Sequence, residues 1–420
     1  MAITLPSGPL LESVRLHPGG PRRQTGRLLV DVRPGPVWLT SARHILNNHF
    51  WRETMDYNYR PTVGTPMEEL DTPCLILDMD ELDNNMDVIA HFYAGQSSKL
   101  RGHSKNHKTP AIAHRQIRRG GTIGGVCSAK VAEAEVMVHG GIPSVFITSE
   151  VIAPLKIDRL CALAQDAEML VACDDPKNAR DLSWAAAAQG VELGVVIELE
   201  TGMGRCGVQD AQQGLALART IQGLPGLAFK GIMSHQTIPV MPDREDRVTE
   251  ARRVIQGVIN LKDTIEADGI PVEIVSTGET WSYDAVGEIP GVTEVQGGSY
   301  LIMETSYDYM TEFHHAGKVL TTIVSTPRPG VAVGDAGIKA VGMLRAMPEV
   351  DGRPGVTVDS MDPDRTVYKL DAGVELQIGD QLALLPPQQD AMVSRWDRFI
   401  GVRNGKVEVV WDIQARGCHN

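Results

Sequence analysis

Between residues 99 and 297 the chain repeats one pattern of apolar and polar positions. Short runs rich in Val, Ile and Leu alternate with longer segments whose apolar positions recur at helical spacing. Eight runs are predicted as strands, at residues 99–105, 121–127, 144–149, 168–173, 192–200, 228–235, 271–276 and 292–297. The helical segments between them cover residues 110–119, 130–140, 152–166, 175–189, 208–223 and 243–268. Apolar strands that alternate with amphipathic helices predict a parallel sheet, and eight such units predict a closed (β/α)8 barrel.

A different pattern begins near residue 318, where short apolar runs are separated by Gly, Pro, Asp and Asn, and no long helix is indicated. These runs are Val319–Ser325, Val331–Val333, Thr366–Leu370, Gln381–Leu385, Phe399–Val402 and Val407–Trp411. They predict an all-β domain after the barrel. A strand at 74–77 and a helix at 80–96, capped by Asp80, come before the barrel. The α/β chain is therefore expected to divide into an N-terminal extension (1–65), a barrel domain (66–318) and a β domain (319–420).

Composition and charge narrow the class of protein. Of the 420 residues, 42% are hydrophobic and 22% are charged, as in ordinary soluble globular proteins. The net charge of -13 disfavours nucleic acid and anionic membranes as partners. The six cysteines form no CxxC pair, which is typical of a reducing compartment, and neither a membrane span nor a signal peptide is indicated. We expect a cytoplasmic protein.

The densest chemical signal lies at the end of the first barrel strand. If residues 99–105 form a strand, alternation places Arg101, His103 and Lys105 on one face, and His107 follows two residues later. A lysine among other cations and apolar walls is typical of enzymes that form a Schiff base. The alternative is a solvated basic turn.

Other strand ends carry groups that suit an anion. Barrel enzymes commonly bind phosphate in the loops after the seventh and eighth strands. At those places the chain has Ser276, Thr277 and Gly278, and then Gly297, Gly298, Ser299 and Tyr300. Arg205, on a glycine-rich loop after the fifth strand, is a candidate partner for a cofactor ring nitrogen, and an Arg–Glu ion pair that shapes the loop is the alternative. His235 follows the sixth strand and is either a pocket residue or an ordinary loop residue.

Several blocks in a fixed order carry a family resemblance. They are Asp71–Asp78, the motif His103-x-Lys105-x-His107-Lys108, Gly125–Glu135, Gly204–Val208, Gly298–Tyr300, Asp335–Lys339 and Gly401–Gly417. Together they span residues 70 to 417. The chain resembles the fold-type III pyridoxal-phosphate enzymes, an alanine racemase-like group that includes D-threonine aldolase, 3-hydroxy-D-aspartate aldolase and D-serine dehydratase.

The resemblance implies roles for several residues. It implies that Lys105 carries the pyridoxal 5'-phosphate, that Arg205 meets the pyridine nitrogen, and that two subunits form a homodimer with shared active sites. An arginine keeps the pyridine nitrogen unprotonated, which suits reactions with limited carbanion character. The implied reaction is retro-aldol cleavage of a small D-β-hydroxy-α-amino acid to glycine and an aldehyde, with His103, His107 or His235 as candidate bases.

The chain departs from the family pattern in two places. Relatives bind Mn²⁺ or a similar ion through a His-x-Cys or His-x-Asp motif, where this chain has Gln388 and Asp390. An amide oxygen and one carboxylate can hold a hard cation such as Mn²⁺ or Mg²⁺ only loosely. Relatives also carry a run of glycines where this chain has Ser276 to Ser282, which includes Glu279 and Trp281. These changes indicate a shifted substrate preference.

The alternatives come from two classes of function. Within enzymes, a dehydratase would eliminate the same hydroxyl group and release ammonia and a 2-oxo acid, and a racemase would invert the α-carbon. A non-catalytic pyridoxal-phosphate carrier on a similar barrel is the alternative outside catalysis, but such carriers consist of the barrel alone. The predicted β domain therefore favours an enzyme.

Overall fold

The computed structural model describes residues 59–235, 241–344 and 346–420, and Arg60–Asn420 form one compact unit. Most of the predicted N-terminal extension lies outside the described residues. No helix in the described part combines the length and the apolar character that crossing a lipid bilayer requires.

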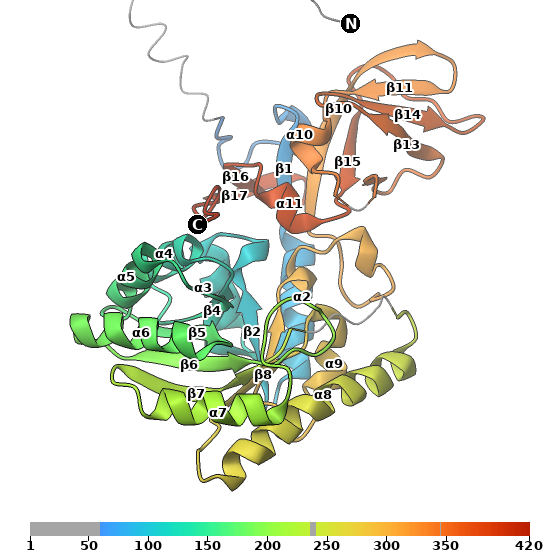
Figure 1. Cartoon of the computed structure of the whole chain (residues 1–420). Helices are drawn as coiled ribbons and strands as arrows, with labels where there is room; N and C mark the ends of the chain where they lie inside the picture. Colours follow the sequence, from blue (N-terminus) through green and yellow to red (C-terminus); the bar gives the residue numbers. More distant parts are fainter. Residues whose placement is uncertain (1–58, 236–240, 345) are drawn as a thin grey trace, which may run out of the picture. The chain divides into compact units, whose positions relative to one another are not determined.

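Eight parallel strands close into a barrel in chain order, which confirms the predicted architecture. They are β2 (Lys99–His103), β3 (Thr122–Ser128), β4 (Ser144–Glu150), β5 (Glu168–Cys173), β6 (Leu193–Glu198), β7 (Leu227–Met233), β8 (Ile274–Thr277) and β9 (Glu294–Gly297). The helices α3 (Pro110–Arg119), α4 (Val131–His139), α5 (Pro154–Leu163), α6 (Pro176–Gln189), α7 (Ala211–Gln222) and α8 (Arg244–Ala267) follow successive strands on the outside of the barrel (Figure 1). The shorter α9 (Tyr283–Val286) lies between β8 and β9.

Alternation along the strands explains the barrel core. Phe146 and Val196 belong to a separate inner cluster, whereas Val145 and Ile147 belong to the large core that includes the helices. Arg101 also lies inside, with its guanidinium in a two-bond ion pair to Glu294 at 2.7 and 2.8 Å. The barrel is therefore filled by side chains rather than open.

Two sequence expectations near the barrel entrance need correction. The first strand ends at His103, not at residue 105, and Lys105 lies in a short 3-10 turn, η4 (Ser104–Asn106). The helix predicted at 80–96 is α2 (Met79–Phe92), and its cap is Asp78, whose carboxylate accepts the N–H groups of Asp80 and Glu81. A cap one position before the first helical residue satisfies N–H groups that the helix itself leaves unpaired.

The second sheet contains every strand predicted after residue 318. Its strands are β10 (Gly317–Arg328), β11 (Val331–Gly334), β12 (Glu349–Val350), β13 (Val356–Met361), β14 (Thr366–Leu370), β15 (Gln381–Leu385), β16 (Arg398–Arg403) and β17 (Lys406–Asp412). The short helices α10 (Ile338–Val341) and α11 (Gln389–Val393) accompany them. The strand predicted at 74–77 is β1 (Cys74–Asp78), which pairs with β10 and β16, so it belongs to this sheet and not to the barrel.

Several contacts connect the second sheet to the barrel and to the turn that carries Lys105. Helix α11 packs against η4. The N–H group of Ala415 donates to the carbonyl of Lys108 at 3.0 Å, and that of Thr305 donates to the carbonyl of Pro386 at 3.1 Å. The C-terminal region therefore helps to position the first barrel turn.

Candidate active site

A pocket lies at the carboxyl ends of β2, β8 and β9. Its lining brings together residues that the sequence singled out, namely His103, Lys105, His235, Gly297, Gly298 and Ser299. It also includes residues for which no role in catalysis or cofactor binding was predicted, namely Asn106, Glu279, Thr280 and Gln296. In barrel enzymes, this end of the strands is where catalytic groups are placed.

Of the three lysines Lys105, Lys108 and Lys130, Lys105 is the one whose amine is free to react inside the pocket. Within the described residues its amine pairs with no carboxylate, and it lines the pocket. The neighbouring Lys108 is buried and paired with Glu133, while Lys130 is exposed to solvent. A nucleophilic lysine must keep its amine free, so Lys105 is the best candidate of the three.

His103 lines the same pocket as this amine and is itself uncharged. Its side chain is buried, its Nδ1 accepts the N–H of Lys105 at 3.3 Å, and its Nε2 lies 3.4 Å from Thr148 Oγ1. Burial lowers the pKa of His103 well below its ordinary value, and the positive charges of Lys105 and His235 lower it further. His103 is therefore a hydrogen-bond partner in its uncharged form.

His107 does not line the pocket. It is fully buried, and its Nδ1 accepts the N–H of Thr109 at 3.1 Å. Burial lowers the pKa of His107 to about 3, and this outweighs the opposing effect of the Thr109 N–H. These contacts give His107 a structural position behind the Lys105 turn.

A second histidine is part of a hydrogen-bonded chain of side chains. His235 Nε2 lies 2.8 Å from Glu279 Oε1, and the indole N–H of Trp281 donates to Glu279 Oε2 at 3.0 Å. Burial raises the pKa of Glu279, but its hydrogen bond to His235 and the charges of His235 and Lys105 reverse this, so the net shift is downward. The Glu279 carboxylate is thus held ionised and fixes the imidazole of His235.

We call the predicted anion-binding residues, Ser276–Gly278 and Gly297–Tyr300, the glycine-rich cup. It is formed mainly by the segment after β9. A Cβ atom at Gly298 would lie 1.9 Å from Asn106 Oδ1, so only glycine fits this position without displacement of Asn106. Asn106 is buried, and its Oδ1 has no hydrogen-bond partner within the part of the chain that the structure describes. A buried polar atom without a partner beside a free amine fits a polar ligand such as pyridoxal phosphate.

The other cup residues predicted from the sequence support the pocket from behind. Ser276 Oγ accepts the amide of Gln296 at 3.2 Å, and Thr277 Oγ1 lies 2.6 Å from Ser234 Oγ. Tyr300 is buried, and its hydroxyl accepts the amide of Gln116 at 2.8 Å. Gly278 has a φ of 82°, which a residue with a side chain adopts only with strain.

Arg205 forms an ion pair with a glutamate, which is the second of the two arrangements that the sequence suggested. Its guanidinium lies 3.8 Å from Glu198 Oε1, its side chain is about half exposed (47%), and it does not line the pocket with Lys105. Its own N–H donates to Glu200 Oε2 at 3.1 Å, which shapes the loop. Its role toward a cofactor ring stays a prediction.

The residues at the family's metal position form a weak donor set. Gln388 Oε1 is buried without a hydrogen-bond partner, and Asp390 Oδ1 accepts the N–H of Ala391. Within the described residues, no group of three His, Cys, Asp or Glu ligand atoms gathers around Asp390. Gln389, which the sequence did not single out, instead ties α11 to the cup, since its amide donates to the carbonyl of Ser299 at 2.8 Å. One carboxylate and one amide do not fit a tightly bound divalent ion.

Comparisons with known proteins agree with this geometry. Residues 77–306 match the family model described as alanine racemase, N-terminal domain, and residues 316–402 match the putative serine dehydratase domain. The chain is 36% identical to 3-hydroxy-D-aspartate aldolase from Paracoccus denitrificans (strain Pd 1222), over 86% of this chain and 96% of the relative. It is 32% identical to D-threonine aldolase from Arthrobacter sp, over 84% and 95%.

A solved structure shows the same fold at similar identity. The crystal structure of D-threonine aldolase from Filomicrobium marinum superposes with a TM-score of 0.82 and 33% identity, over 86% of this chain and 100% of that one. The resemblance predicted from the sequence motifs is confirmed. The chain belongs to the alanine racemase-like, fold-type III family of pyridoxal-phosphate enzymes, in the group that contains D-threonine aldolase and 3-hydroxy-D-aspartate aldolase.

Proposed function

We propose that this protein cleaves small D-β-hydroxy-α-amino acids into glycine and an aldehyde, with pyridoxal phosphate as its cofactor. The observation that carries the proposal is the free amine of Lys105 in one pocket with the His235–Glu279 pair. Bound pyridoxal phosphate supplies the electron sink for the breaking carbon–carbon bond. Aldolase relatives that align over nearly their whole length support this reaction class.

The residues of this chain supply binding and proton transfer. His235 Nε2 is held by Glu279, so its Nδ1, which has no hydrogen-bond partner among the described residues, is left to take the proton of the substrate hydroxyl. The ionised Glu279 stabilises the imidazolium that this transfer creates. Asn106 Oδ1 and the backbone around Gly298 orient the bound group against Lys105.

Product analysis tests the proposal. The purified protein is incubated with D-threonine, L-threonine and both threo and erythro 3-hydroxyaspartate, and glycine, aldehyde, ammonia and 2-oxo acid are measured. We expect glycine and aldehyde from the D-configured compounds. Ammonia with 2-oxo acid would establish the dehydratase alternative, inversion of the α-carbon alone would establish a racemase, and no turnover of any amino acid would favour the carrier.

Matched lysine variants test the central residue. Lys105→Ala should abolish turnover and the borohydride-fixed attachment of the cofactor, because it removes the free amine of the pocket. Lys130→Ala should retain both, since Lys130 is exposed and lies outside the pocket lining. Attachment to Lys108 or Lys130 in the wild type would contradict the assignment.

We also infer a cytoplasmic homodimer that shares its active sites. The resemblance to the family supports the dimer, and the unpaired thiols together with the net charge of -13 suit a reducing compartment and a partner that is neither nucleic acid nor membrane. Light scattering coupled to size-exclusion chromatography tests the assembly. A monomer with full activity at low concentration would contradict shared sites.

A further inference from the structure

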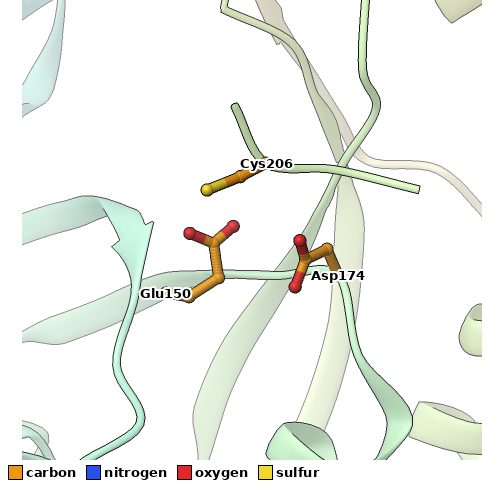
Figure 2. A group of neighbouring side chains, drawn as sticks. All are labelled: Glu150, Asp174 and Cys206. Carbon is orange, nitrogen blue, oxygen red and sulfur yellow. The ribbon is translucent and has the colours of Figure 1, made fainter. Parts of the chain in front are cut away.

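A second cluster of chemical groups lies on another part of the barrel rim. Glu150 ends β4, Asp174 follows β5, and Cys206 lies in the loop after β6. Because the carboxyl ends of neighbouring parallel strands meet at one edge, these three side chains converge (Figure 2). One ligand atom from each lies within 4.8 Å of the others. None of the three lines the Lys105 pocket.

A buried carboxylate with one unpartnered oxygen lies beside this cluster. Glu198, the last residue of β6, is only 3% exposed, and its Oε2 accepts no hydrogen bond from any residue that the structure describes. Its carboxyl group faces that of Glu150, whose Oε1 is also buried and unpartnered. Two carboxylate oxygens without a donor between them are costly to bury unless a proton or a cation lies there.

The acidic groups of this cluster outnumber the cations beside it. Among the described residues, three carboxyl groups and a thiol lie near one cation, Arg205, which is 3.8 Å from Glu198 and about half exposed (47%). Asp174 is oriented by the N–H of Gly207, which donates to its Oδ2 at 2.9 Å. Its other oxygen is left for a ligand.

We propose that Glu150, Asp174, Glu198 and Cys206 form a binding site for a divalent transition-metal ion such as Zn²⁺. A thiolate combined with carboxylates suits Zn²⁺ or Co²⁺ better than Mg²⁺ or Ca²⁺, which prefer oxygen ligands alone. The site differs from the family's metal position at Gln388 and Asp390, because it is built from the ends of β4, β5 and β6. An ion there joins these three strand ends and fixes the loop that carries Arg205.

A metal ion needs deprotonated carboxylates and a thiolate as ligands, so its binding at this cluster releases protons and weakens as the pH falls.

The experiment uses the cofactor-loaded full-length protein and measures metal binding, not turnover. Co²⁺ is added, and difference spectra are recorded against the Zn²⁺-loaded protein so that the cofactor absorbance cancels. We expect a thiolate-to-cobalt absorbance that saturates at one ion per chain and disappears in Cys206→Ser. Cys418→Ser is the matched control, because Cys418 is the other cysteine that is not buried, and it should keep the signal.

Calorimetric titration with Zn²⁺ tests the carboxylates. Asp174→Asn and Glu198→Gln keep the shape of each side chain, and each should weaken Zn²⁺ binding by at least about tenfold. Asp390→Asn should leave this affinity unchanged. The proposal is overturned if wild-type protein binds no Zn²⁺, or if the variants bind it as tightly as the wild type while their circular dichroism is native. These readouts do not depend on the proposed aldol reaction, so either proposal can fail alone.

Discussion

At the scale of single residues, the two pocket histidines differ in the partners that surround them. Burial lowers the pKa of His103, and the positive charge of Lys105 lowers it further, so His103 is uncharged. The Nε2 of His235 instead lies 2.8 Å from the carboxylate of Glu279, which holds the imidazole in place. Proton transfer during aldol cleavage needs a base that can hold its proton for part of the cycle, and this favours His235 over His103.

Variants of this pair give the first prediction. His235→Asn should lower kcat by about 10²–10⁴-fold, the usual contribution of a general base. Glu279→Gln removes the charge, and its single amide oxygen can accept from either His235 or Trp281, so it should lower kcat less than His235→Asn and change KM little. Steady-state kinetics with the preferred substrate measures both effects. If His103→Asn costs more in kcat than His235→Asn, the proton acceptor has been assigned to the wrong histidine.

The ionised state of Glu279 gives a prediction about pH. The pKa of this carboxyl lies below its ordinary value of 4.5, so the folded state favours the carboxylate. Its stabilising contribution is therefore complete above the unfolded value and is lost as the pH falls through the folded value. Urea unfolding should show a wild-type advantage over Glu279→Gln at neutral pH that shrinks below pH 4.5. An advantage that grows in acid would contradict this sign.

Alanine variants of two separate glycines, Gly298 and Gly124, test the close packing of the cup. Gly298→Ala would place a Cβ atom 1.9 Å from Asn106 Oδ1, so Asn106 must move away from the pocket. We expect weaker cofactor binding, measured as the absorbance retained after dialysis. Gly124→Ala is the control, because a Cβ atom there meets nothing within 4 Å and its φ is not positive. Equal cofactor retention in the two variants would show that the cup tolerates the added methyl group.

At the scale of elements, the turn after β2 is held by side chains that do not themselves react. Lys108, which has a φ of 55°, pairs with Glu133 on α4, and the same carboxylate accepts the N–H of Ala129 at 2.9 Å. His107 fills the space behind the turn. These contacts determine where the amine of Lys105 lies, although the sequence shows them only as further charges in a basic cluster.

Two glutamates on α4 give a matched test of this anchor. Glu133 is buried with Lys108, whereas Glu135 pairs with Arg159 and is about one quarter exposed (27%). Glu133→Ala leaves a buried charge unpaired and should lower the free energy of unfolding by about 3–5 kcal/mol. Glu135→Ala should cost about 0–1 kcal/mol. Urea denaturation followed by circular dichroism measures both, and similar losses would mean that the Lys108 pair is not an anchor.

The barrel was predictable from sequence because each strand and helix leaves a local pattern of apolar positions. Lys105 and the glycines after β9 were predictable because barrel enzymes place chemistry at strand ends. Pairings between distant segments leave no such pattern. The ladder of β1 with β10 and β16 joins residues near 76 to residues near 318 and 400, and the hydrogen bond between His235 and Glu279 joins two separate loops.

At the scale of the whole molecule, the second sheet brings α11 to the active-site turn. Gln389 connects this helix to the cup through Ser299, and Glu304 accepts the N–H of Gln389 at 3.0 Å. The adjacent Gln388 occupies the position where the family resemblance implies a metal-binding histidine. The second sheet therefore meets the barrel beside the position where the resemblance implies a metal site.

This position gives the last prediction. Replacing an imidazole with an amide removes a strong ligand, and the loss of one good partner typically costs about 10–100-fold in metal affinity. Wild-type activity should therefore survive EDTA or need about millimolar Mn²⁺. Gln388→His should bind Mn²⁺ at least about tenfold tighter, since Asp390 is already in place, while Gln388→Ala should show no gain.

All proteins in this test also carry Cys206→Ser. This change weakens the metal site proposed at Cys206, so that an ion bound there does not add to the measured amount of Mn²⁺. Bound Mn²⁺ is determined by electron paramagnetic resonance, and activity is assayed after EDTA treatment with and without added Mn²⁺. The amide oxygen of Gln388 and the carboxylate of Asp390 form a weak pair of ligands. Stoichiometric Mn²⁺ in protein that keeps Gln388 and has not been treated with EDTA would therefore contradict the prediction. It would mean that further residues, or a second subunit, complete the site beside Asp390.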